Sequence, residues 1–394
     1  MKHIVNAAAS LLILSGSAAL IYQVAWVRLL SLSMGSTSAS VSTVLAAFFA
    51  GLALGSYFAK RILRNRDRSL TVYVVLEVVV GAAGLALLPI LLNLDHVMAQ
   101  MPAFGTVLGL KFGVTLLLLS IPTICMGATF PVMAAVLVRQ GGELGSRISQ
   151  LYTLNTAGAV VGAGLSGFVL IPAWGLDGAV YCAVSLNAAA ASVAWWLSRR
   201  VAATKPVPPA DMEQTGAAQM QDGESRRGRL LLVLFLTGLV SIATEVGWTK
   251  YLAIYTGTTI YGFTAILTVF LVGITAGSWS IGRVQKHIAP TLPLLVGGLV
   301  ALGGALVLAR VALTAIPSTY ELTRAVGESA QLQHAVKYVV VFAVLFVPTF
   351  LFGAIFPVVL TMYCDGAEHV RARVGPGYAV NTIGSILGAI GAGF

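Results

Sequence analysis

Residues 16–61 of the chain read GSAALIYQVAWVRLLSLSMGSTSASVSTVLAAFFAGLALGSYFAKR, and residues 238–283 read GLVSIATEVGWTKYLAIYTGTTIYGFTAILTVFLVGITAGSWSIGR. The two stretches align without a gap at an offset of 222 residues, and 12 of the 46 aligned pairs are identical. The identical pairs include one tryptophan and four glycines. This pattern indicates that one segment of the fold occurs twice.

Two further blocks repeat in the same order at an offset of 226 residues. In the first, Pro122-Thr123 and residues 127–131 match residues 348–349 and 353–357. In the second, five residues match their counterparts: Arg147, Tyr152, Asn155, Gly158 and Gly162 match Arg373, Tyr378, Asn381, Gly384 and Gly388. Shared apolar composition could imitate one such block, but hardly three in order. We therefore interpret the two halves as an internal duplication.

The composition indicates an integral membrane protein. Of the 394 residues, 58% are hydrophobic and 10% are charged, whereas a soluble domain has roughly 25% charged residues. A secreted disulfide scaffold, a nucleic-acid-binding domain and a soluble enzyme are excluded for the whole chain, so the expected partner is a lipid bilayer and not a nucleic acid. The three cysteines lie far apart, which predicts neither disulfides nor a metal cluster.

Apolar segments long enough to span a bilayer need about 20 residues. Eleven segments meet this criterion and predict an all-α, polytopic helix bundle. They lie near residues 8–30, 38–62, 70–93, 108–138, 148–171, 175–198, 230–254, 260–284, 290–316, 333–363 and 374–394.

Lysine and arginine are distributed unequally between the two sides of the predicted bundle. The side that holds the N-terminus and alternate loops carries 18 of these residues, and the other side carries 6. Because basic residues favour cytoplasmic loops, we expect the N-terminus and residues 199–229 to be cytoplasmic, in a bacterial inner membrane. The net charge of +10 has the same explanation.

The domain organisation follows from the repeat. Residues 1–198 are predicted to form the first transmembrane repeat, residues 199–229 a flexible linker rich in Pro, Gln, Ser and Gly, and residues 230–394 the second repeat. Because both halves are expected to begin in the cytoplasm, the repeats are parallel. The second half reaches only its fifth helix, so we expect it to be truncated before a last helix.

Two acids lie well inside apolar spans, Glu77 and Glu245. Ionisable residues at membrane depth usually face a bundle interior or a watery path. Glu245 aligns with Gln23, and each has a tryptophan three residues later, Trp26 or Trp248. This pattern favours two interpretations: a cation site in which the carboxylate pairs with ammonium beside a tryptophan ring, or a structural hydrogen bond between the halves.

Asn155 and Asn381 are a second polar pair related by the repeat. We interpret them as polar contacts between helices rather than as ligands. Four G-x-x-x-G pairs indicate close helix packing. The five histidines are scattered, and no catalytic or metal-binding motif is found.

Several stretches resemble the bacterial family of fused major-facilitator/spermidine synthase proteins. The resemblance lies in residues 15–30, 35–37, 46–57, 154–158 and 171–176. It covers essentially the whole chain and implies a major-facilitator-like bundle of two six-helix repeats.

In that family the membrane part is followed by a cytoplasmic spermidine synthase-like aminopropyltransferase that uses decarboxylated S-adenosylmethionine. Its Gly-rich cofactor loop and acidic catalytic residues have no counterpart in this sequence, so no catalytic residue and no cofactor are predicted here. The resemblance implies a membrane module that anchors the enzyme or passes its substrate or product. The alternatives are an autonomous secondary transporter of a small metabolite, such as a polyamine or other cation, and a non-transporting scaffold.

Overall fold

The structure is a computed structural model of the full chain. It describes residues 2–34, 38–63, 69–94, 108–138, 143–201, 217–256, 260–314 and 330–393.

Eleven long helices make up nearly all of these residues. They are α1 (Lys2–Met34), α2 (Ser38–Ile62), α3 (Ser69–Leu92), α5 (Leu108–Val138), α6 (Leu144–Leu165), α7 (Ile171–Val201), α8 (Ala217–Thr256), α9 (Ile260–Val284), α10 (Leu292–Thr314), α12 (Ala330–Cys364) and α13 (Val370–Gly393). Each corresponds to one predicted span, which confirms the all-helical prediction.

Two short turns complete the described elements. A π-helical turn, η3 (Ser166–Leu170), joins α6 to α7, and η4 (Ala367–His369) precedes α13. Gly175, with φ 73°, breaks the helical path near the start of α7. By length and apolar composition, nine segments of the described residues can cross a membrane, and one of them, Leu144–Arg200, contains both α6 and α7.

The predicted linker differs from the structure at both ends. Helix α7 continues to Val201, and α8 begins at Ala217, so only residues 202–216 lie outside the described residues of this segment. Residues 217–229 read AAQMQDGESRRGR, and Ala, Gln, Met, Glu and Arg all have high helix propensity. The lack of an apolar stripe predicts exposure here, but it does not exclude a helix.

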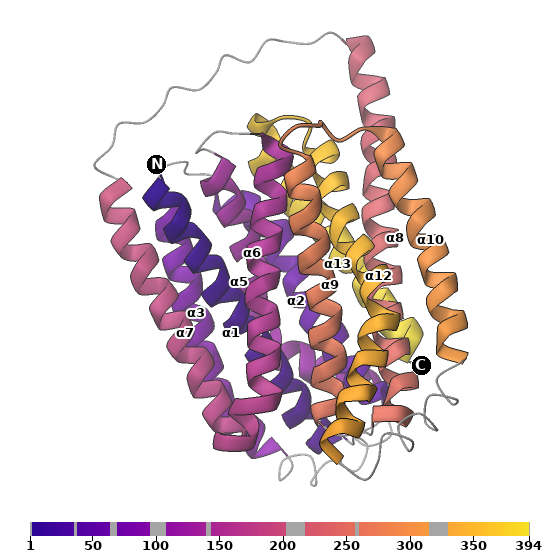
Figure 1. The fold of residues 1–394 in the computed structure, drawn as a ribbon. Coiled ribbons are helices and arrows are strands. Elements are labelled where there is room, and N and C mark those ends of the chain that lie inside the picture. The colour runs from indigo at the N-terminus through magenta and orange to yellow at the C-terminus, as the bar shows by residue number, and fades with distance from the viewer. Residues whose placement is uncertain are drawn as a thin grey trace.

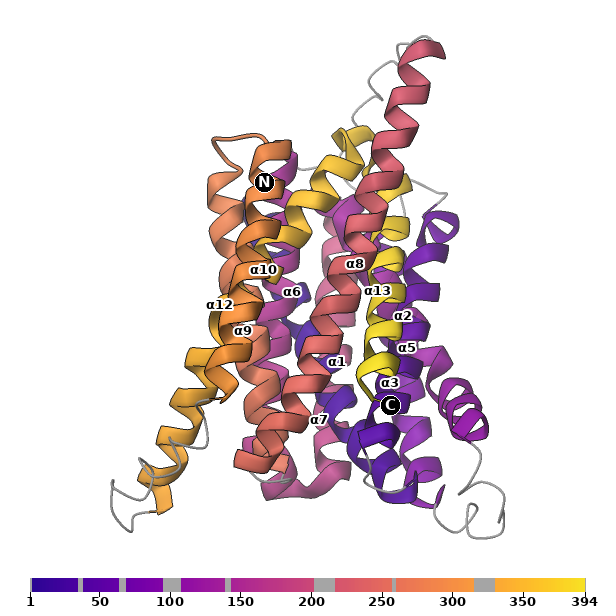
Figure 2. The same cartoon turned by 90° about the vertical axis from the view of Figure 1, so that its right-hand side faces the viewer.

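The two halves lie side by side and run in the same direction. Figure 1 shows the N-terminus and the start of α8 at the same end of the bundle, hereafter the N-terminal end, while α13 finishes at the opposite end. Figure 2 shows α8 and α13 running together along one side. The prediction of parallel repeats is therefore confirmed.

The duplication is reproduced in atomic contacts. A Cβ atom added to Gly55 would lie 1.9 Å from the carbonyl oxygen of Ile124, and one added to Gly277 would lie 1.8 Å from that of Phe350. Five more pairs of equivalent glycines meet equivalent atoms of a neighbouring helix at 1.8 to 2.3 Å: Gly16 and Gly238, Gly51 and Gly273, Gly127 and Gly353, Gly158 and Gly384, and Gly162 and Gly388. These helices touch backbone to backbone, as the G-x-x-x-G pairs predict.

We expect Gly277→Ala to destabilise the bundle, because the new methyl group meets the backbone of α12, which cannot turn away. Overpacking of this kind costs about 1–3 kcal/mol. The matched control is Gly297→Ala on α10, where no atom lies within 4 Å of an added Cβ; this change should stabilise by about 0.5–1 kcal/mol. Thermal unfolding of the purified proteins compares the two. Equal melting temperatures would show that the close contact is not required.

Candidate functional site

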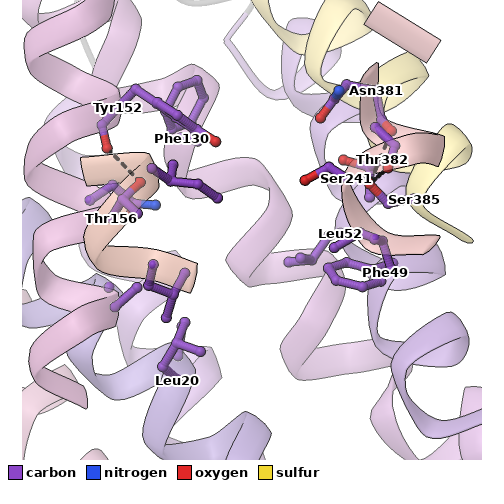
Figure 3. A pocket seen from close by; sticks show the side chains of 18 of the residues that line it. Leu20, Phe49, Leu52, Phe130, Tyr152, Thr156, Ser241, Asn381, Thr382 and Ser385 are labelled. Atoms are coloured by element: carbon purple, nitrogen blue, oxygen red, sulfur yellow. Dashed lines mark hydrogen bonds between the residues drawn. The ribbon is translucent and has the colours of Figure 1, made fainter. Parts of the chain in front are cut away.

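A cavity of about 210 Å³ lies between the two halves. Its lining comes from eight helices, α1, α2, α5 and α6 of the first half and α8, α9, α12 and α13 of the second. Figure 3 shows Phe130 and Tyr152 close together, with Ser241, Asn381 and Thr382 across the cavity. The cavity has room for a small solute.

Equivalent positions of the two repeats line the cavity. On the first helix of each half they are Ser15 and Thr237, Gly16 and Gly238, Ala19 and Ser241, Leu20 and Ile242, and Gln23 and Glu245. The remaining helix pairs match in the same way, for example through Asn155 and Asn381. The pseudo-two-fold axis of the duplication therefore passes through this cavity.

Glu245 is the one charged side chain among the residues that line the cavity. Among the residues that the structure describes, none donates a hydrogen bond to its carboxylate or forms an ion pair with it. Lys250, on the same helix, donates instead to the carbonyl oxygens of Ala392 and Gly393 at 2.6 and 2.8 Å. The cavity therefore presents a carboxylate without a protein cation beside it.

Four aromatic rings from four helices form a closed cluster, hereafter the aromatic cluster. Phe130 stacks on Tyr378 with ring centroids 4.8 Å apart, and Phe356 meets Tyr152 at 4.6 Å. Edge contacts of 6.3 and 6.0 Å join Phe130 to Tyr152 and Phe356 to Tyr378. Since both kinds of contact occur twice, the cluster follows the duplication and joins the halves.

The aromatic cluster lies at the N-terminal end of the cavity, and we infer that it closes that end. Helices α5 and α12 end there, and α6 and α13 begin there. On each of these four helices, the cavity-lining residue nearest the N-terminal end of the bundle is the one whose ring belongs to the aromatic cluster. Gln23 and Glu245 are the lining residues of α1 and α8 farthest from it. The carboxylate and the aromatic cluster thus occupy opposite ends of the cavity.

The predicted asparagine pair lines the cavity. The side-chain amide of Asn381 donates to the carbonyl oxygen of Leu234 on α8 at 2.8 Å, which is the helix contact expected from the sequence. Asn155 occupies the equivalent position on α6. Both asparagines line the cavity, so their polar amide groups are also within reach of a solute.

Trp26 and Trp248 are absent from the lining of the cavity. Trp26 is fully buried and stacks on Tyr22 at 4.8 Å, and Trp248 packs among apolar residues of the second half. Residues three apart on a helix point about 60° away from each other, because each residue turns the helix by about 100°. The spacing predicts a shared face, yet the indoles turn toward neighbouring helices.

Glu77 also lies outside the cavity. It is fully buried in the first half, where the amide of Asn187 on α7 donates to its Oε2 atom at 2.7 Å. Of the seven polar and aromatic candidates from the sequence, the structure thus gathers four around the cavity: Gln23, Asn155, Glu245 and Asn381. Among the described residues, no three His, Cys, Asp or Glu side chains lie close enough to hold a metal ion.

Sequence reasoning missed the aromatic cluster. A signal was present, because the repeat relates Phe130 to Phe356 and Tyr152 to Tyr378 at the same offset of 226 residues. The contacts between the halves could not be predicted from it, since a repeat shows which positions are equivalent but not which ones meet.

We expect removal of two rings to open the N-terminal end of the cavity. The test is carried out on a protein with Cys125, Cys182 and Cys364 replaced by serine and Ser241→Cys added as a reporter in the cavity. A membrane-impermeant thiol reagent applied at the N-terminal end should leave this parent unlabelled and should label it once Phe130→Ala and Phe356→Ala are added. Each ring loss costs about 3–5 kcal/mol, so folded yield is measured alongside.

The control for this experiment is Phe270→Ala, which removes a ring that lines the same cavity farther from the N-terminal end. It should not open that end. Rapid labelling of the parent itself from the N-terminal end would contradict closure by the aromatic cluster.

Solved structures of similar fold cover nearly the whole chain. The E. coli fucose:proton symporter FucP aligns with a TM-score of 0.55 and 13% identity over 98% of this chain and 94% of that chain. A bacterial homologue of the iron transporter ferroportin, in its outward-facing state, aligns with a TM-score of 0.58 and 16% identity over 98% of this chain and 91% of that chain. The proton:xylose symporter XylE aligns with a TM-score of 0.54 and 16% identity over 98% of this chain and 87% of that chain. At these identities the likeness shows the fold alone.

No curated protein sequence matches the chain. The family model of the Major Facilitator Superfamily matches residues 7–392. These comparisons support the major-facilitator part of the resemblance and give no evidence of a spermidine synthase fusion. The chain belongs to the Major Facilitator Superfamily.

Proposed function

We propose that this chain is a secondary transporter that binds a small organic cation in its central cavity. Binding sites of transporters built from repeats lie near the membrane midplane at the interface between the repeats. The cavity described here lies at the interface between the repeats, because equivalent residues of both halves line it. This placement favours an autonomous transporter over the anchoring role that the spermidine synthase resemblance implies.

The observation that carries the choice of a cation is the carboxylate of Glu245. It is the one charged group in the lining, and Lys250 is held by backbone carbonyls of α13. An ionised carboxylate in a low-dielectric site is costly unless it is paired. A bound ammonium group would supply the missing partner, while an anionic solute would be repelled.

The rest of the lining suits an ammonium ion with an apolar or hydroxylated body. Hydroxyl and amide groups from Ser241, Asn155 and Asn381 offer hydrogen bonds, and the ring of Phe270 can attract a cation. A monoamine, a quaternary ammonium ion or a polyamine shares this chemistry.

We further propose that the N-terminal end of the bundle faces the cytoplasm. Its helix ends carry basic residues stacked on aromatic rings: Arg199 lies 4.1 Å from the ring centre of Trp195, Arg200 lies 3.8 Å from that of Trp196, and Arg283 lies 3.6 Å from that of Trp279. Tryptophan is typical of the membrane interface and basic residues of the cytoplasmic side. The aromatic cluster then closes the cavity toward the cytoplasm.

We expect Glu245→Gln to weaken binding of a cation without unfolding the protein, because glutamine keeps the size of the side chain and removes its charge. For spermidine, whose N–H groups can donate to the carboxylate, loss of a hydrogen bond to a charged group costs about 1.5–3 kcal/mol, which corresponds to roughly 10- to 150-fold weaker binding; tetramethylammonium has no N–H group and tests the charge alone. Tetramethylammonium and spermidine are the probes and xylose is the neutral control, measured by ligand-induced thermal stabilisation and by uptake into proteoliposomes.

The matched control moves the charge to the pseudo-symmetric position. The double variant Gln23→Glu and Glu245→Gln keeps one carboxylate in the cavity and should bind cations better than Glu245→Gln alone. Unchanged cation binding by Glu245→Gln would refute the proposed site. Uptake of xylose but of neither cation would refute the choice of a cation, and a wild-type protein that moves none of the probes would favour a non-transporting scaffold.

A further inference from the structure

The last turns of α7 present two different faces at the N-terminal end of the bundle. Ala190, Ala194 and Leu197 are buried among apolar residues of the first half, in which α7 packs against α1 and α3. Trp195 and Trp196 lie on the other face and are 50% and 47% exposed. Figure 1 shows α7 at the edge of the bundle, with its last turns near the start of α1. Because an exposed apolar side chain on a membrane span contacts lipid, we expect both indoles to face the bilayer.

A guanidinium group lies over each of these indoles. Arg199 lies 4.1 Å from the ring centre of Trp195, and Arg200 lies 3.8 Å from that of Trp196. Both arginines are exposed, and among the described residues neither one forms an ion pair or a hydrogen bond. The rings hold the guanidinium groups in place, and the N–H donors of these groups remain for another ligand. The four residues are hereafter the α7 patch.

The α7 patch lies at the level where a membrane span ends. The apolar segment that contains α7 finishes at Arg200. Tryptophan and tyrosine favour this level, because their amphipathic rings suit the boundary between lipid tails and headgroups. The other cation–ring pairs of the described residues also lie in the last turns of spans: Lys60 over Tyr57 and Arg61 over Phe58 on α2, and Arg283 over Trp279 on α9. The arginines of the α7 patch are therefore expected at the depth of lipid headgroups.

The α7 patch carries two positive charges and suits a phosphodiester. Among the described residues, the acids of this end that form ion pairs contact other cations: Asp365 lies 4.0 Å from Arg373, and Glu368 lies 3.1 Å from His369. A phosphodiester has one negative charge shared by two free oxygen atoms, and the fork of an arginine matches such oxygens. The C-terminal end of a helix has partial negative charge, so the backbone of α7 does not attract an anion. Binding would therefore depend on the two arginines.

The indoles favour a lipid over a soluble anion. A free phosphate or an acidic peptide would need only the guanidinium groups. In the α7 patch each guanidinium group lies over a half-exposed indole on a membrane span. An anionic phospholipid matches both parts, because its phosphate can accept from the arginines while its acyl chains lie along the indoles.

We propose that the α7 patch is a binding site for an anionic phospholipid such as phosphatidylglycerol. Arg199 and Arg200 hold the phosphodiester, and the upper part of the acyl chains lies against Trp195 and Trp196. The site is on the outer surface of the bundle, so the proposal does not depend on the proposed transport function.

The test is tryptophan fluorescence of the full chain in phosphatidylcholine vesicles that contain a small fraction of a brominated lipid. Bromine on the upper acyl chain quenches an indole that it contacts. Brominated phosphatidylglycerol should quench more strongly than the same fraction of brominated phosphatidylcholine. The double variant Arg199→Gln and Arg200→Gln keeps both indoles and should lose this excess, with about 30-fold weaker binding for the loss of two basic residues at a membrane surface. Trp195→Phe with Trp196→Phe should also lose it.

The matched control is Lys60→Gln with Arg61→Gln, which removes two charges from the same end of the bundle and should keep most of the excess. An equal loss in the two charge variants would overturn the proposal, because the charge of the whole surface would then explain the effect. An excess that the arginine variant keeps would overturn it as well, and so would removal of the excess by dissolved glycerol phosphate. If the glutamine variant fails to fold, Arg199→Lys with Arg200→Lys, which keeps the charge and loses the fork, should reduce the excess; an unchanged excess there would contradict binding by the guanidinium groups.

Discussion

The contact on which the rest of the structure depends is the approach of helix backbones at glycine. In a bilayer, lipid tails are as apolar as leucine, so helices associate through close packing and polar contacts instead of the hydrophobic effect. At Gly55 and Gly277 even a methyl group would lie less than 2 Å from a carbonyl oxygen of the next helix. Such proximity permits weak Cα–H···O contacts along the helices and fixes helix pairs within each half.

Many contacts between the halves are made by side chains, although Gly375 on α13 also lies close to the backbone of α2, where an added Cβ would be 2.4 Å from the carbonyl oxygen of Ser56. Ser149 on α6 donates to the side chain of Gln285 after α9 at 2.8 Å, and Thr153 lies 2.8 Å from Ser278. The aromatic cluster joins the same halves through rings. Side chains can change rotamer, whereas the backbone contacts within a half cannot be exchanged without separating the helices. We therefore expect each half to keep its shape when the cavity opens or closes.

The sequence predicts the helices and their duplication well because both depend on local patterns. Hydropathy places all eleven helices, and an offset of 222 to 226 residues identifies glycines that later prove to be equivalent contacts. It also predicts polar positions that line the cavity, Gln23 and Glu245, since an acid at membrane depth must face something other than lipid.

What the sequence leaves open depends on contacts between distant residues. Asn187 lies 110 residues from Glu77 and belongs to no repeated block, so nothing in the sequence marks it as the partner of that acid. The direction of the Trp26 indole depends on Tyr22 and Phe48 around it, with ring centroids 4.8 and 6.4 Å away. Helix spacing gives the face of a residue only approximately, and tertiary packing decides the rest.

The packing contacts of this fold occur in both halves, whereas the acids within the spans do not. The close-contact glycines and the rings of the aromatic cluster occupy equivalent positions in the two halves and make equivalent contacts there. The two acids within the spans do not obey the duplication: Glu245 stands opposite Gln23, and Glu77 has no acidic counterpart. Lys250 is the basic residue nearest in sequence to Glu245, yet its ammonium group is occupied by two carbonyl oxygens of α13. The packing of the two halves therefore leaves the carboxyl group of Glu245 in the cavity without a protein cation as its partner.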